Sequence, residues 1–550
     1  MNRKYIVVTG GVLSGLGKGI AMASIGNILS SSYKVVPIKC DGYLNVDPGT
    51  MNPVEHGEVF VLDDGGEVDM DFGHYERFLG TPCKFDWNLT MGRVFNNIRK
   101  KERKGDYLGQ TVQMIPHVSN YIRDHILEVG KKSRAEIVMV EIGGTIGDIE
   151  NELYIDAVRS LTRKVGRENI LFIHLTYVPI PHGVDEQKSK PTQQSVNLLR
   201  QKGIEPDIVI ARCSEMLTGN VKRKIAKFGN LDVDCIFTGI DVNDVYKIPL
   251  SFEEQGMSQL IARKLNMAVN VDLTKWKCLI EKKERASKEI VVGIAGKYTA
   301  LEDSYASIIE ALKHCEANLG VKVKVKWIDT DGGVLDGHDS GEPDLDVLDE
   351  VDGVIVPGGF GSRGTEGKID VISYCRKNDI PFLGICYGLQ RAVIEFARNV
   401  CGFEGANSFE VDKSSEHLVI DILEEQKNVE DKGGTMRLGA YDAILKKGTR
   451  VYELYGEEKV GERHRHRFEV NPSYHEALEG KGLVLSGMSP DRKLVEFIEL
   501  KGHPYFVATQ AHPELKSSLI KPAPLFVGFV RACLGKNDII ERMKNGESVC

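Results

Sequence analysis

Short apolar runs alternate with longer amphipathic segments along the first half of the chain. The runs at residues 5–8, 34–39, 137–141, 170–175, 207–211 and 235–238 are rich in β-branched side chains and predict buried strands. Residues 115–129, 150–164 and 192–201 instead carry apolar positions at helical spacing. This strand, helix, strand order predicts an α/β fold with a doubly wound, mainly parallel sheet, whose ligands lie at the carboxyl ends of the strands.

The pattern changes after about residue 265, through Trp276 and a charged run at 281–288, and a new buried strand begins at residue 290. We therefore predict a first domain at 1–268, a linker at 269–288, a second domain at 289–536 and a polar C-terminal tail at 537–550. In the second domain, residues 323–328, 353–356 and 381–386 predict strands, and residues 417–511 are strand-rich. No fixed-period repeat relates the halves, so we expect two different α/β domains.

Composition and charge narrow the class of protein. The 550 residues are 42% hydrophobic and 27% charged, which suits globular domains, and the formal net charge of −8 offers no general attraction to nucleic acid or anionic membrane. The basic run at 99–104 lacks interleaved aromatics and is predicted to be a solvated helix face. Eleven cysteines without a Cys-x-x-Cys pair indicate neither a disulfide framework nor a zinc ribbon. No apolar stretch reaches 18 residues, and the N-terminus lacks the order of a signal peptide. We expect a cytoplasmic protein with no nucleic-acid or membrane partner.

A glycine-rich loop follows the first predicted strand. Residues 9–19 read TGGVLSGLGKG, and a helix is predicted from Ile20. Glycines allow backbone N–H groups to converge on phosphate oxygens, and Lys18 adds a positive charge. Gly19 stands where such loops usually carry a Ser or Thr that ligates magnesium, so metal ligands must come from elsewhere. Asp71, in an acidic cluster, and Glu141, at the end of a predicted strand, are the candidates; the alternatives are a turn residue and a helix cap.

A second phosphate-binding segment is predicted at 188–193, which reads KSKPTQ. It places two cations in a loop that the proline stiffens before a helix begins. An ordinary solvated loop is the alternative, and the segment alone does not decide between them.

A cysteine nucleophile is predicted in the second half. Residues 381–390 read PFLGICYGLQ, so Cys386 lies between two glycines where a strand turns into a helix. Downstream, His512 and Glu514 follow a predicted strand and supply a base and a carboxylate that orients it. Residues 356–361, VPGGFG, provide the flexible backbone that an oxyanion hole needs. In the run 463–467, RHRHR, interleaved guanidinium groups favour anion binding over metal binding.

These motifs together resemble the CTP synthase family, in which an amidoligase domain precedes a class I glutamine amidotransferase domain. Further matching segments cover nearly the whole chain: NVDPGTM at 45–51, GHYER at 73–77, GDYLG at 105–109, VEIGGTIGDIE at 140–150 and GGTMRLG at 433–439. The resemblance implies a P-loop-like parallel-sheet domain followed by the amidotransferase domain. It implies amination of UTP to CTP, in which ATP phosphorylates the uracil 4-oxygen and ammonia released from L-glutamine displaces that phosphate. It also implies Mg²⁺, activation by GTP through the loops 360–363 and 434–439, feedback inhibition by CTP, and a homotetramer that polymerises into filaments in some members.

The resemblance assigns roles to residues by motif. The catalytic residues would be Cys386, His512 and Glu514, and the magnesium ligands Asp71 and Glu141. ATP would contact Gly15, Leu16, Gly17, Lys18, Gly19, Ile20, Lys39, Asp71, Arg212, Ile240, Asp241 and Val242. UTP and CTP would contact Ser14, Asp148, Ile149, Glu150, Lys188, Ser189, Lys190, Pro191, Thr192, Gln193, Lys224 and Phe228, with Asp148 and Glu150 reading the cytosine. Glutamine would contact Gly359, Phe360, Tyr387, Gly388, Leu389, Gln390, Glu410 and Arg467, and the backbone N–H groups of Gly359 and Tyr387 would form the oxyanion hole.

The chain departs from the family pattern at Tyr387 and Leu389, where Leu and Met are usual, and at Ser362, a position that is often aromatic. Two other functions stay open on sequence grounds. One is a cobyrinate-type amidase, but the predicted phosphate-binding segment at 188–193 and the acidic pair Asp148 and Glu150 argue against it. The other is a partitioning-type ATPase or filament scaffold. Gly19, in place of Ser or Thr, suggests this function, and the predicted triad of Cys386, His512 and Glu514 argues against it.

Overall fold

The computed structural model describes residues 3–52, 56–296, 302–330, 345–422 and 434–535. The chain forms two compact units. Unit 1 comprises Met1–Pro48 and His74–Lys277, and unit 2 comprises Gly49–Gly73 and Cys278–Cys550. Unit 2 thus includes a piece of the first half of the sequence. The predicted tail at 537–550 lies outside the described residues.

Unit 1 is built on a seven-stranded sheet with the order β5-β2-β6-β1-β7-β8-β9, in which every pairing is parallel. This confirms the predicted α/β class. The strands are β1 Lys4–Gly10, β2 Val35–Asp41, β5 Asn88–Thr90, β6 Ile137–Ile142, β7 Ile170–Tyr177, β8 Ile208–Cys213 and β9 Ile236–Ile240. Because β1 lies between β6 and β7, while β2 and β8 lie further out on opposite sides, the carboxyl end of β1 opens at the position where such sheets bind ligands.

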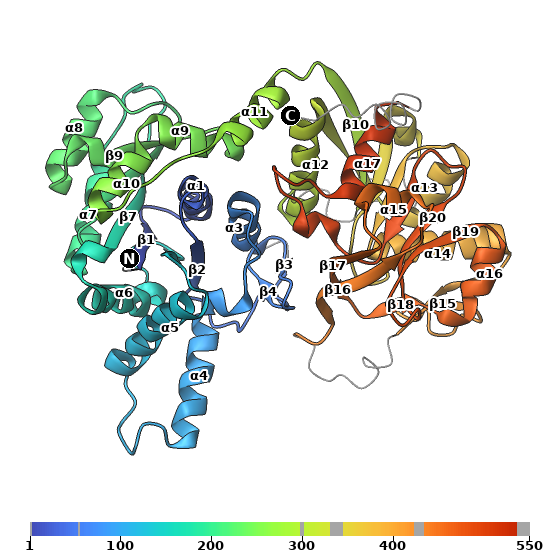
Figure 1. The fold of residues 1–550 in the computed structure, drawn as a ribbon, viewed down its shortest axis with the longest axis horizontal. Coiled ribbons are helices and arrows are strands. Elements are labelled where there is room, and N and C mark those ends of the chain that lie inside the picture. The colour runs from blue at the N-terminus through green and yellow to red at the C-terminus, as the bar shows by residue number, and fades with distance from the viewer. Residues whose placement is uncertain (1–2, 53–55, 297–301, 331–344, 423–433, 536–550) are drawn as a thin grey trace. The chain divides into compact units, whose positions relative to one another are not determined.

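Helices cover this sheet (Figure 1), with α7 and α8 packing their apolar side chains on β8 and β9. The helices that include unit 1 residues are α1 Lys18–Ser30, α3 Asp71–Leu79, α4 Met91–Lys104, α5 Ser119–Lys132, α6 Glu152–Val165, α7 Lys190–Gln201, α8 Gly219–Gly229, α9 Ile248–Glu254, α10 Met257–Leu265 and α11 Thr274–Glu284. The basic run at 99–104 forms the last turns of α4, where cations interact favourably with the helix dipole. No helix of the described residues is long and apolar enough to cross a membrane.

One predicted helix begins later than expected. Residues 115–129 were expected to be helical throughout, but Ile115 is extended, with φ −117° and ψ 127°, and α5 starts at Ser119. The cause is Pro116, because its ring disfavours helical backbone at the preceding residue. The charged stretch before residue 288 also contains a helix, α11, where the sequence pattern had only loosened.

Unit 2 contains a nine-stranded mixed sheet with the order β11-β10-β12-β13-β21-β20-β19-β16-β17. The strands β11 Val321–Asp329, β10 Lys288–Gly296, β12 Gly353–Val356, β13 Phe382–Ile385 and β21 Phe506–Thr509 are parallel, and β20 Val495–Leu500, β19 Leu483–Met488, β16 Arg437–Leu445 and β17 Lys459–His466 pair antiparallel. Smaller sheets join β14 Asn407–Ser408, β15 Leu418–Ile422 and β18 Phe468–Val470, and the hairpin β3 Phe60–Val61 with β4 Glu67–Val68.

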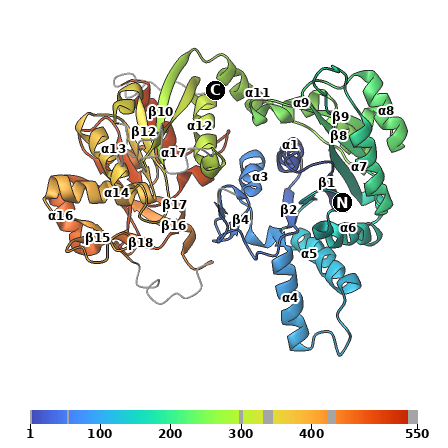
Figure 2. The same cartoon turned by 180° about the vertical axis from the view of Figure 1, so that it is seen from behind.

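Two separate apolar cores hold this sheet between layers of helices (Figure 2). One core packs α12 Ala306–Leu319 and α17 Pro524–Cys533 against the sheet, and the other packs α13 Thr365–Lys377 and α14 Tyr387–Phe396. The short helices α15 Arg450–Tyr455 and α16 His475–Gly480 complete the unit. The carboxyl ends of β12, β13 and β21 carry residues 357–361, Cys386 and His512, so the topology gathers these predicted residues at one edge.

Candidate active sites

The phosphate loop of unit 1 connects β1 to α1. Gly15 and Gly17 have positive φ values of 74° and 81°, which glycine adopts without strain, and Gly17 is the N-cap of α1. The first N–H groups of α1 therefore point into the loop, where an anion is stabilised by these donors and by the helix dipole. The Lys18 ammonium folds back beside Gly10 and donates a hydrogen bond to the Gly144 carbonyl at 2.9 Å. The loop has the backbone geometry of a phosphate site.

Glu141 lies buried on β6. Its Oε1 is 3.1 Å from the Lys39 Nζ, and its Oε2 accepts a hydrogen bond from the Tyr75 hydroxyl at 2.5 Å. A buried carboxylate at the carboxyl end of a strand is an oxygen donor of the kind that Mg²⁺ prefers, so this residue fits the predicted role. Asp71 is the first residue of α3 and belongs to the part of the chain assigned to unit 2. The pairing of Asp71 with Glu141 therefore stays a prediction.

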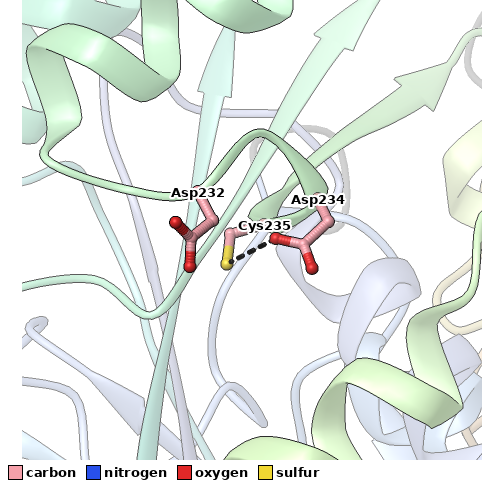
Figure 3. Close-up of side chains that lie close together, drawn as sticks. All are labelled: Asp232, Asp234 and Cys235. Atoms are coloured by element: carbon pink, nitrogen blue, oxygen red, sulfur yellow. Dashed lines mark hydrogen bonds between the residues drawn. The ribbon is translucent and has the colours of Figure 1, made fainter.

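A different acidic group meets metal-ligand spacing within the described residues: Asp232, Asp234 and Cys235 (Figure 3). Asp234 forms an ion pair with Arg263, and its Oδ1 accepts from the Cys235 thiol at 3.6 Å. Burial raises the pKa of Cys235, which keeps the thiol protonated and weak as a ligand. This surface group explains none of the predicted chemistry.

A narrow apolar cavity of about 80 Å³ lies next to the phosphate loop in unit 1. Six residues that the resemblance assigned to ATP line it: Leu16, Gly17, Ile20, Arg212, Ile240 and Val242. The Arg212 guanidinium is fixed by Asp241 at 2.7 Å and by the Gly15 carbonyl at 3.3 Å. Segments from β8, β9 and the loop are thus brought together around one apolar cavity.

The residues predicted to bind UTP and CTP divide into two groups. Lys190 and Pro191 open α7, and Lys188 lies just before it, with its Nζ 2.6 Å from Glu186. Thr192 does not face solvent: its buried hydroxyl donates to the Tyr177 carbonyl at 2.9 Å, which fixes α7 to β7.

The second group lies largely at the surface of unit 1. Ser14, Ile149, Glu150, Lys224 and Phe228 are exposed. Asp148 instead closes its own turn, accepting from the backbone and the hydroxyl of Thr145, both at 2.6 Å.

Cys386 occupies a sharp turn between β13 and α14 in unit 2. Its φ of 51° and ψ of −97° lie outside the regions that side-chain-bearing residues favour, and its N–H donates to the Thr509 carbonyl at 2.7 Å. A Cβ at Gly388 would lie 2.2 Å from the Val356 carbonyl, and one at Gly384 would lie 2.8 Å from the Ala508 Cβ. The flanking glycines are needed for this close approach, which places the thiol at the helix N-terminus.

His512 and Glu514 complete the constellation. The His512 Nδ1 is 2.7 Å from Glu514 Oε1, and both side chains are largely buried. Burial alone would lower the pKa of His512, but Glu514 and then Cys386 raise it, to about 10. Among the described residues the His512 Nε2 has no hydrogen-bond partner, and a Cβ at Gly358 would lie 2.8 Å from His512 Cε1 and 3.7 Å from Cys386 Cβ. The free ring nitrogen therefore belongs to the same small space as the thiol.

A cavity of about 510 Å³ opens over this constellation. Six predicted residues line it: Gly359, Phe360, Cys386, Arg467, His512 and Glu514. The loop at 358–361 is anchored from two directions, because the Gly361 N–H donates to Glu410 at 2.8 Å and the Gly361 carbonyl accepts from the Tyr387 hydroxyl at 2.6 Å. Gln390 binds elsewhere, donating to the Phe468 carbonyl at 3.0 Å. The cavity and the loop can accommodate a substrate amide beside the thiol.

Sequence reasoning missed the contribution of residues 49–73 to this cavity. Gly49, Thr50, Met51, Glu58 and Val59 line it. The same segment carries the carboxylates that pair with the arginine run, since Asp63 lies 2.6 Å from Arg463 and Glu67 lies 2.9 Å from Arg465. The alternation of arginines at 463–467 signalled anion binding, but the anions of Arg463 and Arg465 are side chains of the protein itself.

The two histidines of that run are buried and lie within hydrogen-bond distance of each other, with His464 Nδ1 3.0 Å from His466 Nε2. Burial and then Arg437 lower the pKa of both rings well below the usual value, so both are neutral. They form part of a polar core with Glu469, Glu496 and Arg437, in which Arg437 pairs with Glu496 at 2.6 Å.

Comparisons with known proteins cover both units. The family model for the CTP synthase N-terminus matches residues 4–267, and the model for class I glutamine amidotransferases matches residues 300–532. The CTP synthase of Borreliella afzelii is 51% identical over 97% of this chain and 99% of its own. That of Archaeoglobus fulgidus is 50% identical over 96% of this chain and 98% of its own. A solved structure, the glutaminase domain of Trypanosoma brucei CTPS with bound acivicin, is 35% identical, covers 46% of this chain and 96% of that chain, and has a TM-score of 0.41. The comparisons support the CTP synthase resemblance over the cobyrinate-type amidase and the partitioning-type ATPase or filament scaffold. The chain belongs to the CTP synthase family.

Proposed function

We propose that this protein makes CTP from UTP, using ATP and the ammonia that it releases from glutamine. The observation that carries the proposal is the presence of two sites in one chain: a Cys386, His512 and Glu514 constellation under a cavity, and a phosphate loop beside an apolar cavity. Relatives named CTP synthase, about 50% identical in sequence over nearly the whole chain, suggest a reaction that would use both sites.

In the glutaminase reaction, the Cys386 sulfur attacks the amide carbon of glutamine. The oxyanion that forms accepts hydrogen bonds from the backbone N–H groups of Gly359 and Tyr387. His512, oriented by Glu514, transfers a proton to the amide nitrogen as the carbon–nitrogen bond breaks and ammonia leaves. Water then hydrolyses the thioester to glutamate and restores the thiol. Glu410 and Arg467 are proposed to hold the amino acid end of glutamine.

In the synthase reaction, the phosphate loop and Lys18 hold the ATP phosphates, and the segment 188–193 with Lys224 holds the UTP triphosphate. The γ-phosphoryl group passes to the uracil 4-oxygen, and ammonia then displaces phosphate from that carbon to give CTP. Bound Mg²⁺, held by Asp71 and Glu141, would neutralise charge on the transferred phosphoryl group. Lys39, which pairs with Glu141, lies on the neighbouring strand and adds positive charge at the same edge of the sheet.

Regulation is part of the proposal. GTP would activate glutamine hydrolysis through the loops 360–363 and 434–439, and this is supported by Phe360 and Met436, which line the cavity over Cys386. CTP would inhibit by sharing the triphosphate site of UTP, while the exposed Glu150 and neighbouring Asp148 distinguish the bases. Assembly into homotetramers, and into filaments, is proposed from the family resemblance.

The decisive experiment measures CTP by ion-exchange chromatography after incubation with UTP, ATP and glutamine labelled with ¹⁵N in the amide group, with and without GTP. We expect CTP that carries the label, and formation that requires ATP. No CTP from either labelled glutamine or ammonium would refute the proposal.

A further inference from the structure

Three buried side chains form a continuous hydrogen-bonded chain through the core of unit 1. Thr9 Oγ1 lies 2.9 Å from His174 Nδ1, and His174 Nε2 lies 2.7 Å from Ser195 Oγ. The three residues are at most 2% exposed and come from β1, β7 and α7. None of them was assigned a role by motif.

Each end of this chain is next to a predicted phosphate-binding segment. Thr9 immediately precedes the glycines that begin the phosphate loop. Ser195 lies in α7, the helix that begins at Lys190 directly after Lys188 and Ser189. The loop also rests directly on this helix, because a Cβ at Gly11 would lie 1.7 Å from the Ser195 Oγ and 3.1 Å from His174 Nε2. The spacing between the loop and the start of α7 is therefore set at this point.

The imidazole of His174 couples the directions of its two hydrogen bonds, because one ring nitrogen donates and the other accepts. Burial and then the positive charge of Lys18 lower the pKa of His174 to about 3, so the ring is neutral and carries one donor and one acceptor nitrogen. If Nδ1 donates to Thr9, then Nε2 must accept from Ser195, and the reverse holds for the other tautomer. Loss of either hydroxyl leaves a buried ring nitrogen without its partner, which favours movement of the neighbouring segment.

We propose that His174, with Thr9 and Ser195, is a positioning residue. It holds the phosphate loop and the UTP-binding segment at 188–193 at the separation needed for phosphoryl transfer. This rests on the proposed function of those two segments. The side chains touch neither nucleotide, and they act by keeping two bound phosphate chains in register. Misplacement by about 1 Å lowers the rate of a reaction between bound partners by up to about 100-fold, while each partner still binds.

The test uses variants that each interrupt the chain on one side of His174; Thr9→Val also removes the weaker hydrogen bond of Thr9 to the Ile173 carbonyl at 3.4 Å. Ser195→Ala removes the hydroxyl on α7, and Thr9→Val removes the one on β1 while keeping its shape. Thr9→Ser keeps the hydroxyl and is the conservative control. Ser258→Ala is the matched control in α10, because it also removes a buried serine hydroxyl of unit 1, one that donates to Glu253 at 2.6 Å.

Three quantities are measured on the full-length protein: kcat for CTP formation from ammonium, the Kd and stoichiometry of UTP alone, and the Kd and stoichiometry of a non-hydrolysable ATP analogue alone. We expect Ser195→Ala and Thr9→Val to lower kcat by about 10- to 100-fold, with both Kd values within about threefold of wild type and full stoichiometry. Thr9→Ser and Ser258→Ala should retain wild-type kcat. The double variant should be no slower than the slower single variant, because either change already breaks the chain.

The proposal is overturned if the two variants keep kcat within about twofold, if their loss of kcat equals the loss of binding stoichiometry, or if the double variant shows the product of the single effects. Failure of the underlying function is recognised separately, because the wild-type protein would then form no CTP.

Discussion

Tyr387, one of the three positions at which the sequence departs from the expected family pattern, ties the turn at Cys386 to the loop at 358–361. Its hydroxyl donates to the Gly361 carbonyl at 2.6 Å and lies 2.7 Å from the Thr365 hydroxyl, in a site that is 3% exposed. The Arg391 guanidinium stacks over the ring at 4.1 Å and fixes its orientation. The substitution Tyr387→Phe removes both hydrogen bonds and keeps the ring.

The expected size of the effect follows from those two contacts. A hydrogen bond contributes about 1 kcal/mol net, so the loss of both weakens the attachment of Tyr387 to the segment from Gly361 to Thr365 by about 2 kcal/mol. Since about 1.4 kcal/mol changes a rate tenfold, full transmission to the transition state would lower kcat/KM by about 30-fold. Glu410 still accepts from the Gly361 N–H and retains part of the loop's support, so we expect a loss of about 5- to 30-fold in kcat/KM for glutamine hydrolysis.

The assay compares two reactions of the same variant. Glutamate release reports the glutaminase site, and CTP formation from added ammonium reports the synthase site, which should be unchanged. Tyr374→Phe is the matched control, because it also removes a tyrosine hydroxyl from unit 2, one that donates to Asp349 at 2.5 Å at the surface. Wild-type glutaminase kinetics in Tyr387→Phe would refute this reasoning, and so would an equal loss of both reactions in a folded variant.

The remaining predictions separate the two sites and test the charge of the triad. Cys386→Ala should abolish glutamine-dependent CTP formation and keep the ammonium-dependent reaction at high pH, as measured by CTP yield, because the thiol takes no part in phosphoryl transfer. Lys18→Ala should abolish CTP formation from both nitrogen sources and spare basal glutamate release; near-normal synthesis would show that this loop is not the ATP site. The pKa of His512 is raised to about 10 from an ordinary value of about 6.5, so its contribution to stability is complete below pH 6.5 and is lost as the pH rises to about 10. Thermal unfolding of wild type between pH 6.5 and 10 should therefore show a decline that is smaller in Glu514→Gln, and parallel curves would contradict the assigned pKa.

The sequence predicted the strands well, because a buried strand is marked by a short, continuous run of apolar residues. The runs at 5–8, 137–141 and 170–175 appear as β1, β6 and β7, each one to two residues longer at an end, since burial on both faces of a parallel sheet demands continuous apolar residues. The turn at Cys386 was also predictable, because only glycines tolerate the contacts found at 384 and 388. The start of α5 was predictable in principle from Pro116, and the helical periodicity concealed it.

Contacts between distant segments escaped prediction because no local rule specifies them. Thr192 belongs to a motif that suggests phosphate binding, yet its hydroxyl is buried on β7, which depends on where α7 packs. The hydrogen bonds of Gln390 to the Phe468 carbonyl and of Glu410 to the Gly361 N–H likewise join residues far apart in sequence. Motif position named these residues as candidates, and the structure shows which atoms each one contacts.

The path of residues 49–73 is a feature of the structure that a boundary drawn on sequence near residue 268 does not capture. This segment leaves the chain of unit 1 after β2 and supplies unit 2 with the hairpin β3 and β4. The hairpin is fixed there by the Asp63 carbonyl, which accepts from the Ala440 N–H at 3.0 Å, and by the ion pair of Glu67 with Arg465. Asp71, the predicted magnesium ligand, is four positions after Glu67 in the sequence, and this is at most about 14 Å of extended chain. The Arg465 carbonyl in turn lies 3.8 Å from the Cys386 sulfur. A short path therefore connects Asp71 with the surroundings of Cys386, through the backbone and one ion pair among the described residues.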